Sequence, residues 1–101
     1  MAKVGERIGA IVSAKDGVVE LLGYGVRGED AVPPSNAVGF GAVLHEAGAP
    51  NPCLKLDDGS EVFGCECWWG SEEAIKSKFA NFTVKNITVA EFRSQASEAA
   101  S

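Results

Sequence analysis

Short runs of Ile and Val that alternate with small or polar residues dominate the first quarter of the chain. Two of these runs, residues 7–14 and 18–26, flank the tripeptide Lys15-Asp16-Gly17. Asp-Gly supplies the positive φ angles that a tight hairpin turn needs. The pattern therefore predicts an N-terminal β-hairpin.

Alternation along the second of these strands sorts its side chains into two faces. With a period of two, Leu22 and Tyr24 share one face, and Gly23 and Gly25 lie on the other. Two glycines on one face leave room for a bend, or for another element to pack against the backbone.

The middle of the chain contains two proline-containing loops, at residues 32–36 and 49–52. Between them, apolar residues alternate with small ones from residue 38 to residue 45. This alternation favours a strand, and a single helical turn at residues 42–47 is the alternative.

A second hairpin follows, built from residues 54–56, an Asp57-Asp58-Gly59 turn and a strand at residues 61–69. Along that strand, alternation places one uncharged set of side chains on the core side: Phe63, Cys65, Cys67 and Trp69. The opposite face then carries Val62, Gly64, Glu66 and Trp68.

Two helices are predicted in the C-terminal third. Ser71 is a good N-cap for a helix at residues 71–79, because two acidic residues follow it in the first turn. After a strand at residues 82–87, Thr88-Val89-Ala90-Glu91 is a capping box that begins a second helix.

Five or six short strands in 101 residues predict a β-dominated α+β fold. We expect a small antiparallel β-barrel or half-barrel in residues 1–93, as a single domain, with a β-sandwich as the alternative. By fold analogy, the helix between the last two strands corresponds to the helical turn of a Src-homology-three-like barrel. Residues 94–101 contain only Ser, Gln, Ala and Glu and are expected to form a flexible tail.

The net charge of −5 argues against two classes of partner. Nucleic acids and anionic membrane surfaces are bound by clustered Lys and Arg, whereas the nine basic residues here are scattered among fourteen acidic ones. No apolar run is long enough for a signal peptide or a membrane span, so we expect a cytoplasmic protein. Its odd count of three cysteines then indicates reduced thiols.

Neither a metal nor another cofactor is expected. One His and three Cys can form a tetrahedral zinc site, but His45, Cys53, Cys65 and Cys67 lack the close ligand pairs of such sites. Residues 23–28 match the dinucleotide-binding pattern Gly-x-Gly-x-x-Gly, yet prolines follow where that motif requires a helix.

The most promising candidate site is the pair Glu66 and Trp68. An indole face attracts cations and a carboxylate accepts their protons, so the pair suits a cationic or hydrogen-bond-donating ligand. We therefore expect a binding module that contacts a small molecule or a peptide through Glu66, Trp68, Tyr24 and His45. The alternative places Trp68 in a homodimer interface or under the proline-rich loop.

An enzyme is the second hypothesis. His45 is the only histidine in the sequence, and it would act as the base of a small hydrolase or isomerase together with Glu46 or Glu66. Neighbouring residues on a strand point to opposite faces, so Glu46 is poorly placed to orient His45.

Five short strings within residues 32–70 carry a family resemblance: Val-Pro-Pro, Leu-His-Glu-Ala-Gly, Pro-Asn-Pro, Leu-Asp-Asp-Gly and Gly-Cys-Glu-Cys-Trp-Trp-Gly. This stretch of sequence resembles small uncharacterised bacterial and phage proteins, including products of mobile integron gene cassettes. The resemblance implies a compact single-domain product of a mobile gene, often an adaptor or interaction protein. It assigns no role to any residue.

Overall fold

The predicted N-terminal hairpin is present and is longer than expected. In the computed structural model, which describes residues 3–100 and the side chains of residues 3–96, β1 (Arg7–Lys15) pairs antiparallel with β2 (Val18–Ala31). Asp16 and Gly17 form the connecting turn with φ angles of 52° and 77°. Positive φ at both central residues is the geometry that Asp-Gly favours in two-residue hairpins.

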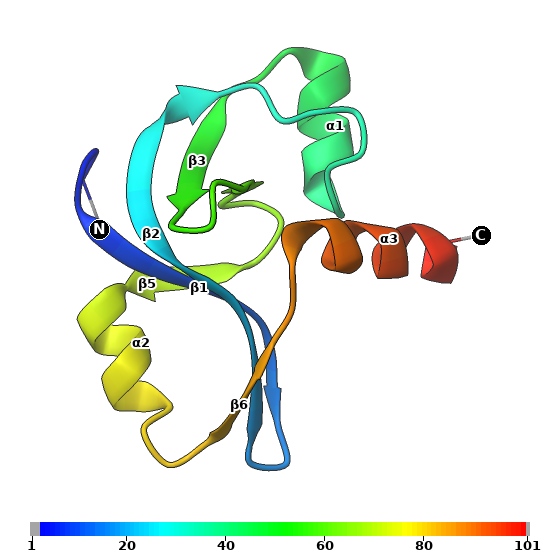
Figure 1. Ribbon diagram of the computed structural model, residues 1–101. Coiled ribbons are helices and arrows are strands. Elements are labelled where there is room, and N and C mark those ends of the chain that lie inside the picture. Colours follow the sequence, from blue (N-terminus) through cyan, green and yellow to red (C-terminus); the bar gives the residue numbers. More distant parts are fainter. Residues whose placement is uncertain (1–2, 101) are drawn as a thin grey trace.

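β2 is the central strand of the sheet (Figure 1). β3 (Asn51–Leu56) pairs antiparallel with its C-terminal half, and β4 (Glu61–Phe63) pairs antiparallel with β3. β5 (Trp68–Ser71) pairs antiparallel with β1. β6 (Thr83–Asn86) pairs parallel with the first residues of β2. The strand order is β4-β3-β2-β1-β5, with β6 attached to β2 beside this path.

The prediction of a β-dominated α+β fold is confirmed: six strands are accompanied by α1 (Phe40–Ala47), α2 (Glu72–Lys78) and α3 (Val89–Ala100). The sheet curls, but its hydrogen-bonded path is open, because no pairing of β4 with β5 joins its two ends within the described residues (Figure 1). All strand pairs are antiparallel except β2 with β6.

A sharp change of register in the first hairpin corrects the predicted faces of β2. Gly23 pairs with Ala10, and Leu21 with Ile11, so Leu22 is left without a partner on β1. Gly23 has a φ of 149°, which glycine adopts far more readily than other residues. A bulge of one residue resets the alternation. Leu22 and Tyr24, predicted to share a face, therefore pack against different clusters.

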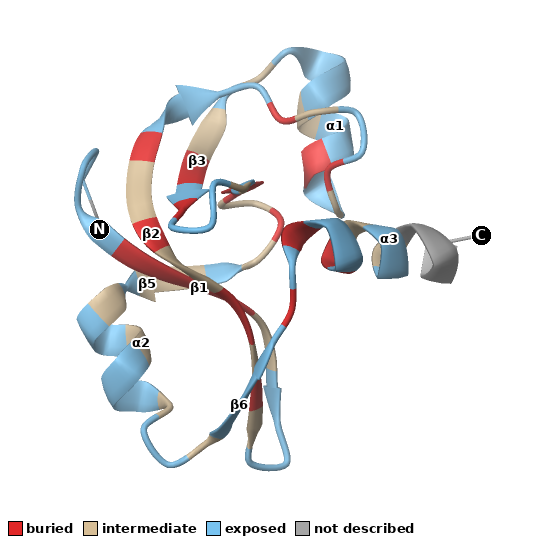
Figure 2. Ribbon diagram, in the orientation of Figure 1, coloured by how far each residue is buried: buried red, intermediate tan, exposed pale blue. Residues whose placement is uncertain are grey.

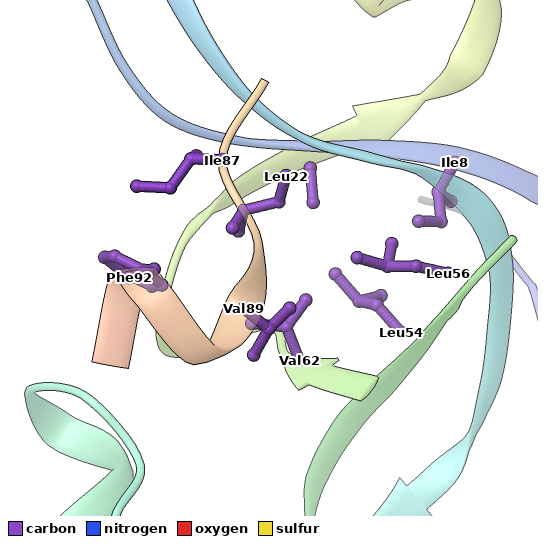
Figure 3. Close-up of a cluster of buried hydrophobic side chains, with 9 residues drawn as sticks. Ile8, Leu22, Leu54, Leu56, Val62, Ile87, Val89 and Phe92 are labelled. Carbon is purple, nitrogen blue, oxygen red and sulfur yellow. The ribbon is translucent and has the colours of Figure 1, made fainter. Parts of the chain in front are cut away.

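Two apolar clusters lie on the two sides of this hairpin. The larger joins the sheet to the start of α3 (Figure 3) and consists of Ile8, Ala10, Leu22, Leu54, Leu56, Val62, Ile87, Val89 and Phe92. The smaller contains Ile11, Val19 and Leu21, with Tyr24, Ile75, Phe79 and Phe82 packed against it. Burial on both faces explains why buried residues concentrate along β1 and β2, whereas α1 and α2 are mostly exposed (Figure 2).

The segment for which alternation favoured a strand is instead the helix α1. Gly39 occupies its N-cap without a side-chain hydrogen bond, and Gly48 ends it in the left-handed conformation with a φ of 65°. Small residues that alternate with apolar ones fit either state, so the C-terminal glycine was the informative signal. Within α1, Gly41 packs closely against the preceding loop, since an added Cβ would lie 2.5 Å from the Cβ of Ala37.

Both predicted N-caps are confirmed. Ser71 Oγ accepts a hydrogen bond from Ala74 N at 3.1 Å, and Thr88 Oγ1 accepts one from Glu91 N at 3.1 Å. α3 then continues to Ala100, so residues 94–100, predicted to be a flexible tail, are helical. Ser101 lies outside the described residues.

Candidate functional site

The segment that carries both tryptophans is not the single strand that alternation predicted. β4 ends at Phe63 and β5 begins at Trp68, with a turn between them. Gly64 is held against the Trp69 indole, where an added Cβ would lie 2.7 Å from Nε1. Glu66 N donates to Phe63 O at 2.9 Å and closes the turn. Residues 64–67 form this turn and not an extended strand, so the alternation of faces predicted for residues 61–69 ends at Phe63.

This turn buries Glu66, which alternation placed on the face opposite the core side chains, as a candidate contact residue. Its side chain has no exposed area. Oε1 accepts a hydrogen bond from Val38 N at 2.8 Å, and Oε2 accepts one from Phe63 N at 2.8 Å. A buried carboxylate must be compensated, because removing its charge from water costs several kcal/mol. The two backbone donors supply part of that compensation.

Arg93 on α3 supplies the remaining compensation of the Glu66 charge. Arg93 was not identified from the sequence as a partner of Glu66. Its Nε donates to Glu66 Oε1 at 2.9 Å, and its Nη2 donates to Glu66 Oε2 at 2.8 Å. These bonds raise the pKa of the Arg93 guanidinium above its ordinary value. With four hydrogen bonds on its two oxygens, Glu66 has no free position to offer a ligand. The sequence signal for this ion pair was a single carboxylate within an otherwise apolar run, since such a carboxylate requires a cationic partner when the run is buried.

Trp68 is, by contrast, the most exposed large apolar side chain among the described residues, at 72% of its full accessible area. It stands beside a shallow depression of about 390 Å³. The other residues that line this depression are Val12, Val38, Cys65, Glu66, Cys67 and Phe92. Glu66 thus lies near Trp68, as predicted, but its charge is neutralised by Arg93 beneath the surface. The depression and Trp68 together are called the Trp68 surface below.

The other two predicted contact residues lie elsewhere. Tyr24 packs against the smaller cluster, its ring lies over Gly9, and the Nζ of Lys76 sits 4.9 Å from the ring centroid. His45 is exposed on α1, with Nδ1 2.9 Å from Pro33 O, to which it donates. The structure therefore does not gather the four predicted residues into one site.

The three cysteines are free thiols, and burial raises the pKa of each of them. The effect is largest at Cys67, whose pKa is raised to about 12, chiefly by burial. A thiol with a raised pKa is a poor nucleophile and a poor metal ligand, since both roles need the thiolate. Among the described residues, no three His, Cys, Asp or Glu side chains are placed to hold a metal ion together.

Comparison of the chain with protein-family models, curated proteins and solved structures finds no match. The resemblance to integron cassette products therefore stays a prediction. No described helix is both long enough and apolar enough to cross a membrane.

Proposed function

We propose that this protein is a non-enzymatic binding module that contacts a peptide segment of a partner protein through the Trp68 surface. The observation that carries the proposal is the 72% exposure of Trp68. Exposing an indole to water is unfavourable, and Trp is enriched among the residues that dominate protein interfaces. The adjoining depression offers an apolar side chain of the partner a place to insert.

The electrostatics of the Trp68 surface also favour an apolar contact. Among the described residues, Glu66 is the single charged residue that lines the depression, and Arg93 compensates it. A partner residue that enters the depression therefore meets no uncompensated charge. Because the whole chain carries −5, a weakly basic or uncharged peptide suits it better than an acidic one.

The enzyme hypothesis gains less support. Glu66 would have to give up its ion pair with Arg93 before it could act as a base. The imidazole of His45 is bonded to the carbonyl of Pro33, and Glu46 remains its neighbour on the exposed α1. The half-barrel of Src-homology-three-like type, the cytoplasmic location and the origin in a mobile gene remain parts of the proposal.

Selection of peptides from a random display library on the immobilised protein tests the proposal. Peptides selected on the wild type should bind Trp68→Ala at least about tenfold more weakly, the loss expected of an interface hot spot. Val84→Ala is the matched control, because Val84 is 49% exposed on β6, away from the Trp68 surface. Equal binding to wild type and Trp68→Ala would contradict the proposal.

A further inference from the structure

The edge of β2 that faces away from β1 is covered in two separate stretches. β6 pairs with this edge as far as Leu21, and β3 begins to pair with it at Gly25. β1 occupies the opposite edge along the same length, so both strands share one side of β2. Leu22, Gly23 and Tyr24 lie in the gap between them. The bulge at Leu22 is therefore also the place where the sheet is split.

A depression of about 460 Å³ lies at this gap. Four buried side chains line it, two from β2, one from β3 and one from the linker between β6 and α3: Leu21, Leu22, Leu56 and Ile87. Two of the exposed residues at its mouth are the acidic pair Asp57 and Asp58, from the turn that follows β3. Figure 3 labels Leu22, Leu56 and Ile87 within the larger cluster. The gap is thus an apolar hollow with carboxylates at its opening.

The two carboxylates differ in how their charges are compensated. Asp57 accepts two hydrogen bonds of 2.7 Å from the guanidinium of Arg7. Asp58 accepts its hydrogen bonds from the backbone N and the Oγ of Ser60, both neutral donors. These bonds hold the pKa of Asp58 below its ordinary value of 3.8, so it is ionised at neutral pH. Among the described residues, Asp58 has no ion-pair partner.

We infer that this gap is a binding site for a small amphipathic cation, an ammonium or guanidinium group on a short apolar chain. The apolar chain enters the hollow between Leu56 and Ile87, where burial is favourable by about 25 cal/mol for each Å² removed from water. The cationic group stays at the mouth beside Asp58. Charge complementarity decides the ligand class, because an anionic head group would meet the carboxylate of Asp58, which no cationic side chain among the described residues compensates.

The site is separate from the Trp68 surface, since the two depressions share no lining residue. n-Octylammonium is a suitable probe, with octanoate and 1-octanol as chain-matched comparisons. Titration into the ¹⁵N-labelled protein should shift the amide signals of Leu22, Gly23 and Ile87. The affinity should decrease in the order ammonium, alcohol, carboxylate.

Asp58→Asn tests the charge without removing the turn, because the amide oxygen can still accept from Ser60 N. This variant should bind n-octylammonium about two- to fivefold more weakly, as expected for a solvent-accessible ion pair. Asp16→Asn is the matched control: it removes one negative charge from an exposed turn, and Asn tolerates the positive φ of 52° there. It should bind like the wild type.

Three results would overturn the inference. Octanoate that binds as tightly as n-octylammonium would remove the charge argument. An equal loss of affinity for n-octylammonium in Asp16→Asn and Asp58→Asn would show that the net charge of the protein, and not the position of Asp58, determines binding. Shifts confined to residues around Trp68 would place the probe on the Trp68 surface, which would support that surface and exclude this site.

Discussion

Glu66 and Arg93, 27 positions apart in the sequence, form a two-point ion pair beneath the Trp68 surface, with N–O distances of 2.9 and 2.8 Å. The same carboxylate accepts backbone hydrogen bonds from Val38 and Phe63. One side chain therefore joins α3, the loop before α1 and the end of β4. The Glu66 carboxylate thus anchors α3 directly, and α1 through the loop that precedes it.

Glu66→Gln should lower the free energy of unfolding by about 3 kcal/mol, because it leaves the Arg93 guanidinium without its anion. Urea denaturation measures this loss. Adding Arg93→Met should recover part of the stability, since the unpaired charge is then removed as well. A double variant less stable than Glu66→Gln alone would show that Arg93 contributes through packing instead.

The neighbouring tryptophans should respond differently to truncation. Trp68→Ala should change the unfolding free energy by no more than about 0.5 kcal/mol, because the side chain is mostly in water. Trp69→Ala should cost about 2 kcal/mol or more, because Trp69 packs against the larger cluster. Thermal melting followed by circular dichroism measures both. A large loss in Trp68→Ala would make Trp68 a structural residue and remove it from the proposed contact surface.

Arg7 should make stability depend on acidity. It hydrogen-bonds to Asp57 and Glu72 and lowers the pKa of both from their ordinary values of 3.8 and 4.5. A lowered folded-state pKa stabilises the protein above the ordinary value, and this contribution is lost as the pH falls through the folded-state pKa. The urea midpoint should therefore fall as the pH decreases below about 4.

Arg7→Gln should flatten that part of the profile, whereas Lys15→Gln, a control for charge at the other end of β1, should leave it steep. An unchanged slope in Arg7→Gln would assign the acid sensitivity to other carboxyl groups.

Gly25 should be intolerant of any side chain. A Cβ at this position would overlap the carbonyl oxygen of Lys55 and lie 2.6 Å from Leu56 Cα, so β3 could not pair with β2 as it does. Gly25→Ala should cost about 3 kcal/mol or more. At Gly70 the nearest atom to an added Cβ is Ile75 Cδ1 at 3.8 Å. Gly70→Ala should therefore fold normally in the same denaturation assay, and equal losses in the two variants would contradict the argument.

Structural features that depend on residues a few positions apart were predicted correctly from the sequence. Asp16-Gly17 determines its turn, and Ser71 and Thr88 cap the helices that follow them, since each feature depends on residues a few positions away. Alternation failed at Leu22 and after Phe63, where a bulge and a turn reset it. In the sequence, a neighbouring glycine is the single indication of either the bulge or the turn.

The candidate site was predicted only in part for a related reason. Trp68 is exposed beside the depression, but the burial of Glu66 depends on Arg93, and nothing near Glu66 in the sequence indicates which of nine basic residues meets it. Alternation assigned Tyr24 to the face of Leu22, and this was wrong because the bulge at Leu22 changes the register of β2. Long-range pairing of charges is decided by the fold, so a single sequence does not reveal it.

The parallel pairing of β6 with β2 also has a consequence for how the chain folds during synthesis. Val18 lies beside Thr83, so the edge of β2 near the hairpin turn stays uncovered until most of the chain has been made. Contacts between such distant residues form late, because closing a long loop costs entropy. A nascent chain that ends before Thr83 exposes Val19 and Leu21 next to an unpaired strand edge. Such an unpaired edge with apolar side chains beside it favours aggregation.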